Sequence, residues 1–214
     1  MPDTNQTFHK QPLNLIACVN KQNALGKGGE LLYRITHDFE WFKTLTKGHI
    51  VVMGYKTFLE IGKPLPERIN LVYVDAMRPK PTLPEGIIPV SSLDEIFLIA
   101  GFNSHLEIFI LGGEKLFKEA FEYGVDTIYR TFVHEEKDGD VHFIPFEKIK
   151  ASYRLKNVLP DTFEGVNHID KKHVKYQFEI WEKRLDNQSE KAMEWLYKQK
   201  GRVVDELGRN QEET

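Results

Sequence analysis

The sequence has little of several features that mark particular classes of protein. Its 214 residues include one cysteine, Cys18, so no internal disulfide can form, which fits a reducing compartment. The formal net charge is only -3, which argues against a general nucleic-acid binder because such proteins carry a basic excess. No apolar run could cross a bilayer, and residues 1–12 lack the apolar stretch of a secretory signal. We therefore expect a cytoplasmic protein without a nucleic-acid or membrane partner.

Motifs for metal and nucleophile chemistry are also missing. The eight histidines show no metal-ligand spacing, and the His-Glu-Glu at 134–136 is not a zinc motif, so no metal is expected. The sequence has no Gly-x-Ser-x-Gly turn for a nucleophile and no Gly-x-Gly-x-x-Gly fingerprint of a standard dinucleotide-binding domain. Covalent and metal-assisted catalysis are thus disfavoured.

Hydrophobic residues make up 41% of the chain, which is enough for a real core. Early predicted strands alternate with predicted helices, whereas the last two do not. This pattern indicates an α/β fold with a mainly parallel eight-stranded central sheet, an antiparallel C-terminal edge and flanking helices. The predicted strands are residues 13–20, 49–55, 69–74, 86–90, 107–113, 127–133, 152–159 and 175–183.

Three regions are expected along the chain: a flexible segment 1–12, one domain over 13–184, and a helical extension over 185–214. The extension carries a broken apolar stripe that Gly201 interrupts. We favour a helix packed on its own domain; a contact with a second copy or a partner is the alternative. A monomer is favoured over a dimer.

The stretch GGELLYRITHDFEWFKTLTKG, residues 28–48, organises the rest of the chain. It predicts a glycine-rich loop followed by an amphipathic helix with Thr36 as N-cap and Asp38 in the first turn. Phe39 and Phe42 fall on the inward face of that helix. Asp38 has two interpretations: a water-facing acid that complements the helix dipole, or a half-buried acid that binds a cationic or amidine-like ligand through paired hydrogen bonds.

Glycine-rich turns follow several predicted strands. Gly54-Tyr55-Lys56-Thr57 and Gly112-Gly113-Glu114-Lys115 each connect a strand to a helix. Such turns are either plain tight turns or seats for phosphate oxygens at helix N-termini. Two of them in one sheet suggest a pyrophosphate, and hence a dinucleotide, near the carboxyl ends of the strands. A dinucleotide with a single acid, and no nucleophile or metal, indicates hydride transfer.

These segments resemble the dihydrofolate reductase family, in family order, from about residue 13 to 183. LIACVNKQNALGKGGELLYRITHDFEWFK resembles the first strand, mobile active-site loop and acid-bearing helix. VVMGYKTFLEIGKPLPERINLVYV resembles the second strand, the cofactor turn and the substrate-binding segment. IFILGGEKLF resembles the second glycine turn, and TIYRTFVHEEKDGDVHFIPF the strand and signature beyond it. Ordered matches of this kind are more specific than any single motif.

The resemblance implies NADPH-dependent reduction of 7,8-dihydrofolate to 5,6,7,8-tetrahydrofolate, which supplies one-carbon and thymidylate metabolism. Asp38 would bind the pterin ring, supported by Thr131, while Leu31 and Tyr33 on the mobile loop would complete the catalytic set. The implied substrate-binding residues are Ile16, Asp38, Phe39, Phe42, Ile61, Leu65 and Arg68, with Arg68 pairing a carboxylate of the glutamate tail. The implied cofactor-binding residues are Ala17, Cys18, Leu25, Gly26, Gly54, Tyr55, Lys56, Thr57, Val74, Asp75, Leu111, Gly112, Gly113, Glu114, Lys115, Leu116 and Phe117.

The sequence departs from the family pattern in places that bear on function. Leu32-Tyr33 replaces the usual Pro-Trp of the loop. Tyr55 replaces a basic residue, and Val74 and Asp75 replace hydroxyl residues, at the positions that bind the 2′-phosphate of NADPH. NADPH is favoured, with NADH possible because an acid can accept from a ribose hydroxyl. The alternatives are a riboflavin-pathway reductase of the same fold and a catalytically inactive binding or structural module.

Overall fold

The computed structural model describes residues 11–75, 77, 81–102, 105–158 and 162–184. The chain divides into two units, Met1–Glu182 and Lys183–Thr214, and the first of them holds the fold described below. The predicted helix over 185–214 and most of the predicted flexible segment 1–12 lie outside the described residues.

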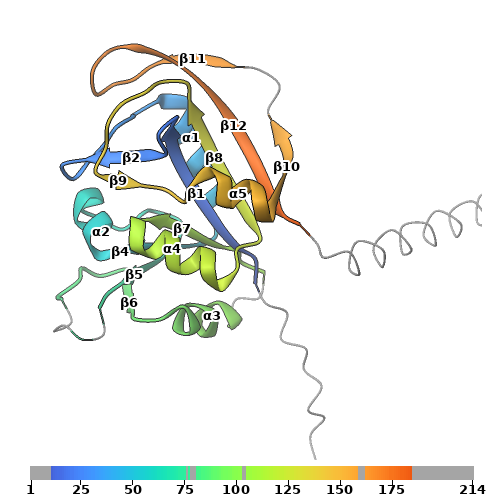
Figure 1. The fold of residues 1–214 in the computed structure, drawn as a ribbon. Helices are drawn as coiled ribbons and strands as arrows, with labels where there is room; N and C mark the ends of the chain where they lie inside the picture. Colours follow the sequence, from blue (N-terminus) through green and yellow to red (C-terminus); the bar gives the residue numbers. More distant parts are fainter. Residues whose placement is uncertain (1–10, 76, 78–80, 103–104, 159–161, 185–214) are drawn as a thin grey trace, which may run out of the picture. The chain divides into compact units, whose positions relative to one another are not determined.

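The central sheet follows the strand order β10-β12-β8-β1-β7-β4-β5-β6, with β11 paired to β12 (Figure 1). Neighbours from β8 through β6 run parallel, whereas β12 is antiparallel to both β8 and β11. The predicted fold class is confirmed. The strands are β1 (Leu13–Asn20), β4 (Ile50–Gly54), β5 (Ile69–Tyr73), β6 (Ile87–Val90), β7 (Ile108–Gly112), β8 (Thr127–Val133), β10 (Tyr153–Val158), β11 (Phe163–Val166) and β12 (His173–Lys183).

All eight predicted strands are present in the central sheet, which has nine strands among the described residues instead of the predicted eight. The ninth strand, β11, has only four residues and pairs with the start of β12. Its sequence, Phe-Glu-Gly-Val, is too short to show a period of two. Pairing with β12 stabilises this strand, which the local strand propensity of the four residues does not predict.

Helices cover both faces of the sheet (Figure 1). They are α1 (Thr36–Thr46), α2 (Tyr55–Ile61), α3 (Leu93–Gly101), α4 (Glu114–Tyr123) and α5 (Phe146–Ser152). The core on one side includes Val52 and Ile110, and the core on the other includes Val51 and Met53, because successive residues of a strand point to opposite faces. Burial on both faces explains why these strands are almost entirely apolar.

Helix α1 begins differently from the sequence prediction. Ile35, not Thr36, occupies the N-cap position, and no side chain caps the helix. Thr36 is already helical, and its hydroxyl lies 3.0 Å from Nε2 of His168 instead. By contrast, α3 has a side-chain cap, since the Ser92 side chain accepts from the Glu95 amide.

A second sheet of three short strands covers part of the carboxyl end of the central sheet. Its order is β3-β2-β9, with β2 (Ala24–Lys27), β3 (Glu30–Leu31) and β9 (Val141–His142). The sequence predicted only a loop here, because glycines dominate residues 26–29. Residues 24–27 form a strand because they pair with β9, which lies more than 110 residues away in the sequence. We call residues 24–31 the active-site loop, after the mobile loop of the family that this segment resembles.

Candidate active site

A cleft of about 1840 Å³ opens at the carboxyl ends of β1, β4, β5 and β7. Open α/β sheets place their ligand sites at this edge. Every residue that the sequence predicted for the site lines this cleft, with the exception of Thr131, which lies behind Asp38. The segments that carry these residues therefore meet at one cleft, while the individual roles of the residues stay predictions.

Asp38 projects from the first turn of α1 and is half-buried at the cleft. The buried hydroxyl of Thr131 on β8 donates to its Oδ1 at 2.6 Å. Burial raises the pKa of the Asp38 carboxyl to about 6, although the hydrogen bond from Thr131 acts in the opposite direction. A water-facing acid would show neither feature. The second carboxylate oxygen is therefore placed to bind a hydrogen-bond donor in the cleft.

The first turn of α1 is fixed to β8, β12 and the β11–β12 loop by three consecutive residues. Thr36 contacts His168, Asp38 contacts Thr131, and Nδ1 of His37 lies 2.8 Å from the hydroxyl of Tyr176 on β12. Tyr176 is fully buried. These contacts fix the position of the carboxylate.

Two phenylalanines and an arginine extend the cleft along α1. Phe39 and Phe42 both line it, and the Arg68 guanidinium lies 5.7 Å from the Phe42 ring centroid. Nε and Nη1 of Arg68 donate to the Thr46 hydroxyl at 2.8 Å and the Pro66 carbonyl at 2.7 Å. Nη2 makes only a 3.5 Å contact with the Lys43 carbonyl, so it is the nitrogen best placed to bind an anion. The cleft thus has an acid at one end of the aromatic wall and a fixed cation at the other.

The glycine turns bring two strand ends into close contact. A Cβ on Gly112 would lie 3.1 Å from the Phe117 ring, and one on Gly54 would lie 3.3 Å from the Gly113 nitrogen. Gly112 also has a φ of 122°, a conformation that side chains disfavour, and the peptide between Gly112 and Gly113 is cis. Backbone groups are therefore exposed to the cleft where a side chain would otherwise stand.

At the end of β5 the cleft is acidic and aromatic. Asp75 accepts from the Met77 amide at 3.0 Å, and the Tyr73 hydroxyl donates to Glu119 at 2.5 Å. Val74 is buried, whereas Tyr55 and Lys56 are exposed at the start of α2. Lys56 follows the glycine turn of β4, and Lys115 follows the glycine turn of β7.

A family model described as dihydrofolate reductase matches residues 12–183. The chain belongs to the dihydrofolate reductase family. The dihydrofolate reductase of Bacillus subtilis is 33% identical over 172 residues, which cover 80% of this chain and 95% of the relative. That of Staphylococcus aureus strain Mu50 is 31% identical over 159 residues, 71% of this chain and 94% of the relative. A solved dihydrofolate reductase from Enterococcus faecalis, in complex with NADP(H) and RAB-propyl, has a TM-score of 0.65 at 26% identity and covers 81% of this chain and 97% of its own.

Several residues that line the cleft were not predicted from the sequence or from the family resemblance. His168, Ile169 and Lys171 come from the loop between β11 and β12, and nothing in their local sequence suggests a site. Lys43 and Lys47 also line the cleft; Lys43 falls outside the apolar face of α1, and Lys47 follows the last residue of the helix. The other additions are Gly29, Glu30, Arg34, Thr44, Glu60, Pro66, Glu67, Tyr73, Pro81 and Val141.

The departure at Leu32-Tyr33 from the dihydrofolate reductase pattern leaves an aromatic residue buried in the cleft wall. Tyr33 is 2% exposed, and its hydroxyl accepts from Nδ2 of Asn20 at 3.4 Å. Burial raises the pKa of the Tyr33 phenol to about 12, so it stays protonated. The pKa of the Cys18 thiol is also raised well above its usual value, first by burial and then by the nearby Asp38. Neither group supplies a nucleophile at neutral pH.

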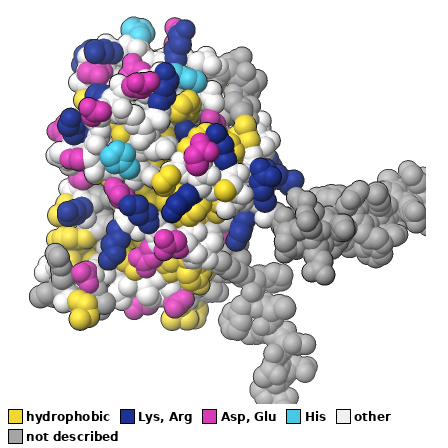
Figure 2. Space-filling model, in the orientation of Figure 1, with side chains coloured by type: hydrophobic (Ala, Val, Ile, Leu, Met, Phe, Trp, Pro, Cys, Tyr) yellow, Lys and Arg dark blue, Asp and Glu magenta, His cyan; other side chains and the backbone are white. Residues whose placement is uncertain are grey.

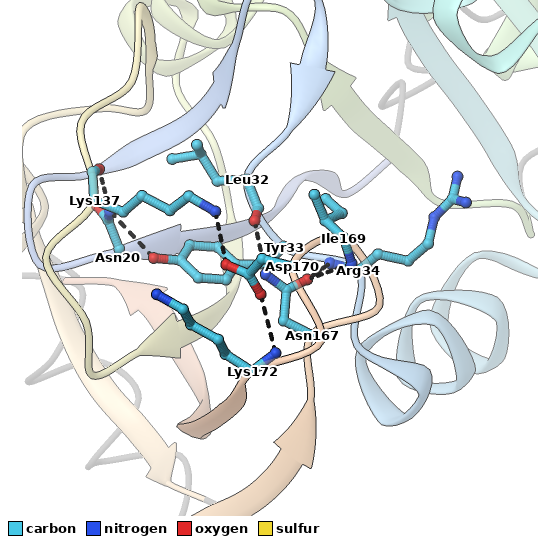
Figure 3. A network of polar contacts seen from close by, with 9 residues as sticks. All are labelled: Asn20, Leu32, Tyr33, Arg34, Lys137, Asn167, Ile169, Asp170 and Lys172. Atoms are coloured by element: carbon cyan, nitrogen blue, oxygen red, sulfur yellow. Dashed lines mark hydrogen bonds and ion pairs between the residues drawn. The ribbon is translucent and has the colours of Figure 1, made fainter.

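A polar network holds the segment between the active-site loop and α1. Figure 3 shows the Asn167 side chain lying between the backbones of Leu32 and Arg34. Its Oδ1 accepts from the Arg34 amide at 2.9 Å, and its Nδ2 donates to the Leu32 carbonyl at 3.1 Å. Beside it, Lys137 and Asp170 form an ion pair at 3.1 Å, with the Lys137 ammonium 5.8 Å from the Tyr33 ring centroid. The β11–β12 loop thereby fixes the chain that leads to Asp38.

Replacing Asn167 with alanine is expected to lower the free energy of unfolding by about 2–4 kcal/mol. The residue is fully buried, so the substitution leaves the Arg34 amide and the Leu32 carbonyl without partners. Urea unfolding measures the change. Asn157→Ala, at an exposed position of β10, is the matched control and should stay within about 0.5 kcal/mol of the parent. Equal effects of the two substitutions would contradict the role given to Asn167.

The raised pKa of Asp38 predicts a pH-dependent cost to stability. The carboxyl holds its proton up to about pH 6 when folded, against an ordinary value of 3.8, so folded chains bind more protons between these limits. Stability from this group is therefore full below about pH 4 and is lost as the pH rises through 6. Asp38→Asn should be more stable than the parent by about 1–2 kcal/mol at pH 7.5, and the difference should vanish near pH 4. Urea unfolding at both pH values tests this; a variant that is less stable at pH 7.5 would contradict it.

Among the residues that the structure describes, no group of three or more His, Cys, Asp and Glu side chains is arranged to hold a metal ion. Within the same residues, no helix is long and apolar enough to cross a membrane.

Proposed function

We propose that this chain reduces 7,8-dihydrofolate to 5,6,7,8-tetrahydrofolate with NADPH as hydride donor. The observation that carries the proposal is the half-buried Asp38, held by Thr131, in the same cleft as two close-approach glycine turns. The family membership supports dihydrofolate as the substrate, and the NADP(H)-bound relative supports NADPH as the hydride donor.

Asp38 would bind the pterin ring. One carboxylate oxygen accepts from Thr131, and the carboxylate can accept in addition from the ring N3–H and the 2-amino group. An ionised acid in a pocket of low polarity favours a protonated pterin, which is the better hydride acceptor. A water then delivers the proton to N5. Phe39 and Phe42 would pack on the benzoyl group, and Arg68 would pair with a carboxylate of the glutamate tail.

The topology supports one direction for the bound cofactor. Gly54 and Gly112 end the neighbouring strands β4 and β7, where exposed backbone can approach a pyrophosphate. Asp38 lies on the β1 and β8 side of these turns, through its contact with Thr131. The nicotinamide would therefore lie toward Ala17 and Cys18, and the adenosine toward the end of β5. When bound, NADPH supplies the hydride for C6 of the pterin.

The active-site loop would limit access of water to the reacting carbons. Leu31, at the end of β3, lines the cleft and is 50% exposed in the structure. A bound nicotinamide and pterin would cover it, and its side chain would exclude water from the hydride path.

NADH as an alternative donor is favoured by one observation. Asp75 and Tyr55 line the cleft where a 2′-phosphate would bind, and an acid there suits a ribose hydroxyl better.

The basic and acidic side chains on the visible face are interspersed, with no patch of a single sign (Figure 2). The cytoplasmic location and the monomeric state stay predictions from the sequence.

The proposal is tested by following the oxidation of NADPH and of NADH side by side, with and without dihydrofolate. We expect dihydrofolate-dependent turnover, with NADPH the better donor. Faster turnover with NADH would identify Asp75 as a cofactor-selecting acid. A folded protein without turnover on either donor would overturn the proposal and favour the riboflavin-type substrate or an inactive binding module.

A further inference from the structure

The first turn of α4 faces the proposed cofactor seat on one side and the small sheet on the other. Glu114 directly follows the Gly112-Gly113 turn and lines the cleft. Its Oε2 accepts from the backbone amide of His142, on β9, at 3.0 Å. In the same turn of α4, the ring of Phe117 packs edge-to-face on Phe143 with centroids 4.8 Å apart. The turn that would hold the pyrophosphate is thus bonded to β9.

Strand β9 in turn pairs with the active-site loop. Ala24 pairs with His142 and Gly26 with Val141. Next to this pairing, the Asp140 amide donates to the Gly26 carbonyl at 3.0 Å, and its carboxylate accepts from the Gly28 amide at 2.9 Å. Strand β2 then pairs with β3, which ends at Leu31. A continuous series of hydrogen bonds therefore joins Glu114 to the loop.

The backbones in this series of hydrogen bonds are closely packed. A Cβ on Gly139 would lie 2.7 Å from the Gly26 carbonyl oxygen and 2.8 Å from the Ala24 Cβ. A Cβ on Gly26 would lie 2.8 Å from the Glu30 carbonyl oxygen. Because the backbones are packed this closely, a shift of β9 must move β2 and β3 with it.

The charge of Glu114 would be unfavourable beside a pyrophosphate unless it were directed elsewhere. Its Oε1 pairs with Lys118 at 2.5 Å, one turn along α4, and its Oε2 is bonded to His142. Lys118 and the His142 amide together lower the pKa of the Glu114 carboxyl. The carboxylate is ionised at neutral pH, and both of its oxygens are bonded to partners outside the glycine turn.

We propose that Glu114 is a positioning residue that ties the active-site loop to the cofactor seat. The inference rests on the proposed function, because it takes the Gly112-Gly113 turn as the seat of the dinucleotide. Through the amide of His142, Glu114 holds β9, and β9 holds residues 24–31 in the position that covers the nicotinamide. The loop and the cofactor turn are coupled. Loss of the hydrogen bond at Glu114 therefore loosens the loop and lowers the affinity for the cofactor.

Kinetics separate this role from a general structural one. Glu114→Ala should raise KM for NADPH and slow single-turnover hydride transfer, each by about fivefold to tenfold, as expected for one lost charge-assisted hydrogen bond. KM for dihydrofolate should change by less than about twofold, because Asp38 and Arg68 are anchored to other elements. Glu114→Gln keeps an acceptor for the His142 amide and should restore near-parental values. Glu122→Ala removes an exposed acid at the other end of α4 and is the matched control.

Hydrogen exchange of the full chain without cofactor tests the coupling independently of activity. Glu114→Ala should speed amide exchange in residues 24–31 and 141–143 by about tenfold, while β1, β4 and β7 keep the parental rates. Glu114→Gln should match the parent. The inference is overturned if exchange in the loop is unchanged in Glu114→Ala, if Glu114→Gln behaves like the alanine variant, or if the central strands are affected equally. A chain without reductase activity could still show the expected exchange pattern. The two experiments therefore distinguish failure of the proposed function from failure of this inference.

Discussion

Asp38→Asn is expected to lower kcat for dihydrofolate reduction on the order of 10²- to 10³-fold while leaving the fold intact. An asparagine keeps an acceptor for the Thr131 hydroxyl but carries no charge to favour a protonated pterin. Its amide hydrogens would also face the donors of the ring. Stopped-flow or steady-state oxidation of NADPH measures the loss, and circular dichroism checks the fold.

Glu40→Gln is the matched control for this substitution, because Glu40 is an exposed acid two residues further along α1. It should leave kcat within about twofold of the parent. Thr131→Val should have an intermediate effect of about tenfold, since it removes the 2.6 Å hydrogen bond but retains the charge. An asparagine variant at Asp38 with near-parental turnover would show that the acid has another role.

Arg68→Gln should raise KM for dihydrofolate by about 10²-fold, with little change in KM for NADPH. The guanidinium is held by the Thr46 hydroxyl and the Pro66 carbonyl, so its remaining nitrogen is pre-oriented for a carboxylate. Glutamine is neutral and too short to reproduce this arrangement. Arg68→Lys keeps the charge without the planar fork and should lose about tenfold.

Because Arg68 also holds α1 to the segment before β5, the substitutions are to be compared by urea unfolding as well as by kinetics. Arg154→Gln, on the exposed surface of β10, is the control for loss of a positive charge. An equal rise in KM for both substrates in Arg68→Gln would contradict a role at the glutamate end and indicate a general disturbance of the cleft.

The central strands and the convergence of the site residues could be predicted from the sequence. Strands such as β4 and β7 are buried on both faces, and this requirement gives unbroken apolar runs that are visible without a structure. The parallel arrangement then brings their carboxyl ends, Gly54 and Gly112, to one edge. For this reason the glycine turns and Asp38 could be assigned to one site before their distances were known.

Features that depend on contacts between distant segments could not be predicted. The active-site loop becomes a small sheet only through β9, and the first turn of α1 is anchored by His168 and Tyr176, more than 130 residues away. The hydroxyl of Thr36 suits an N-cap in the local sequence, yet it binds His168 because Ile35 is buried in the cap position. Likewise, Glu114 follows a glycine turn like any first-turn acid, and only the fold brings it to His142.

The measurement that tests the account most directly is the transfer of deuterium from NADPH labelled at the nicotinamide C4, with dihydrofolate as acceptor, in the parent and in Asp38→Asn. The account predicts that the parent forms tetrahydrofolate with one deuterium at C6, and that the variant forms the same product far more slowly. Deuterium lost to water, label elsewhere in the product, or equal rates in the two proteins would contradict direct hydride transfer in the cleft beside Asp38.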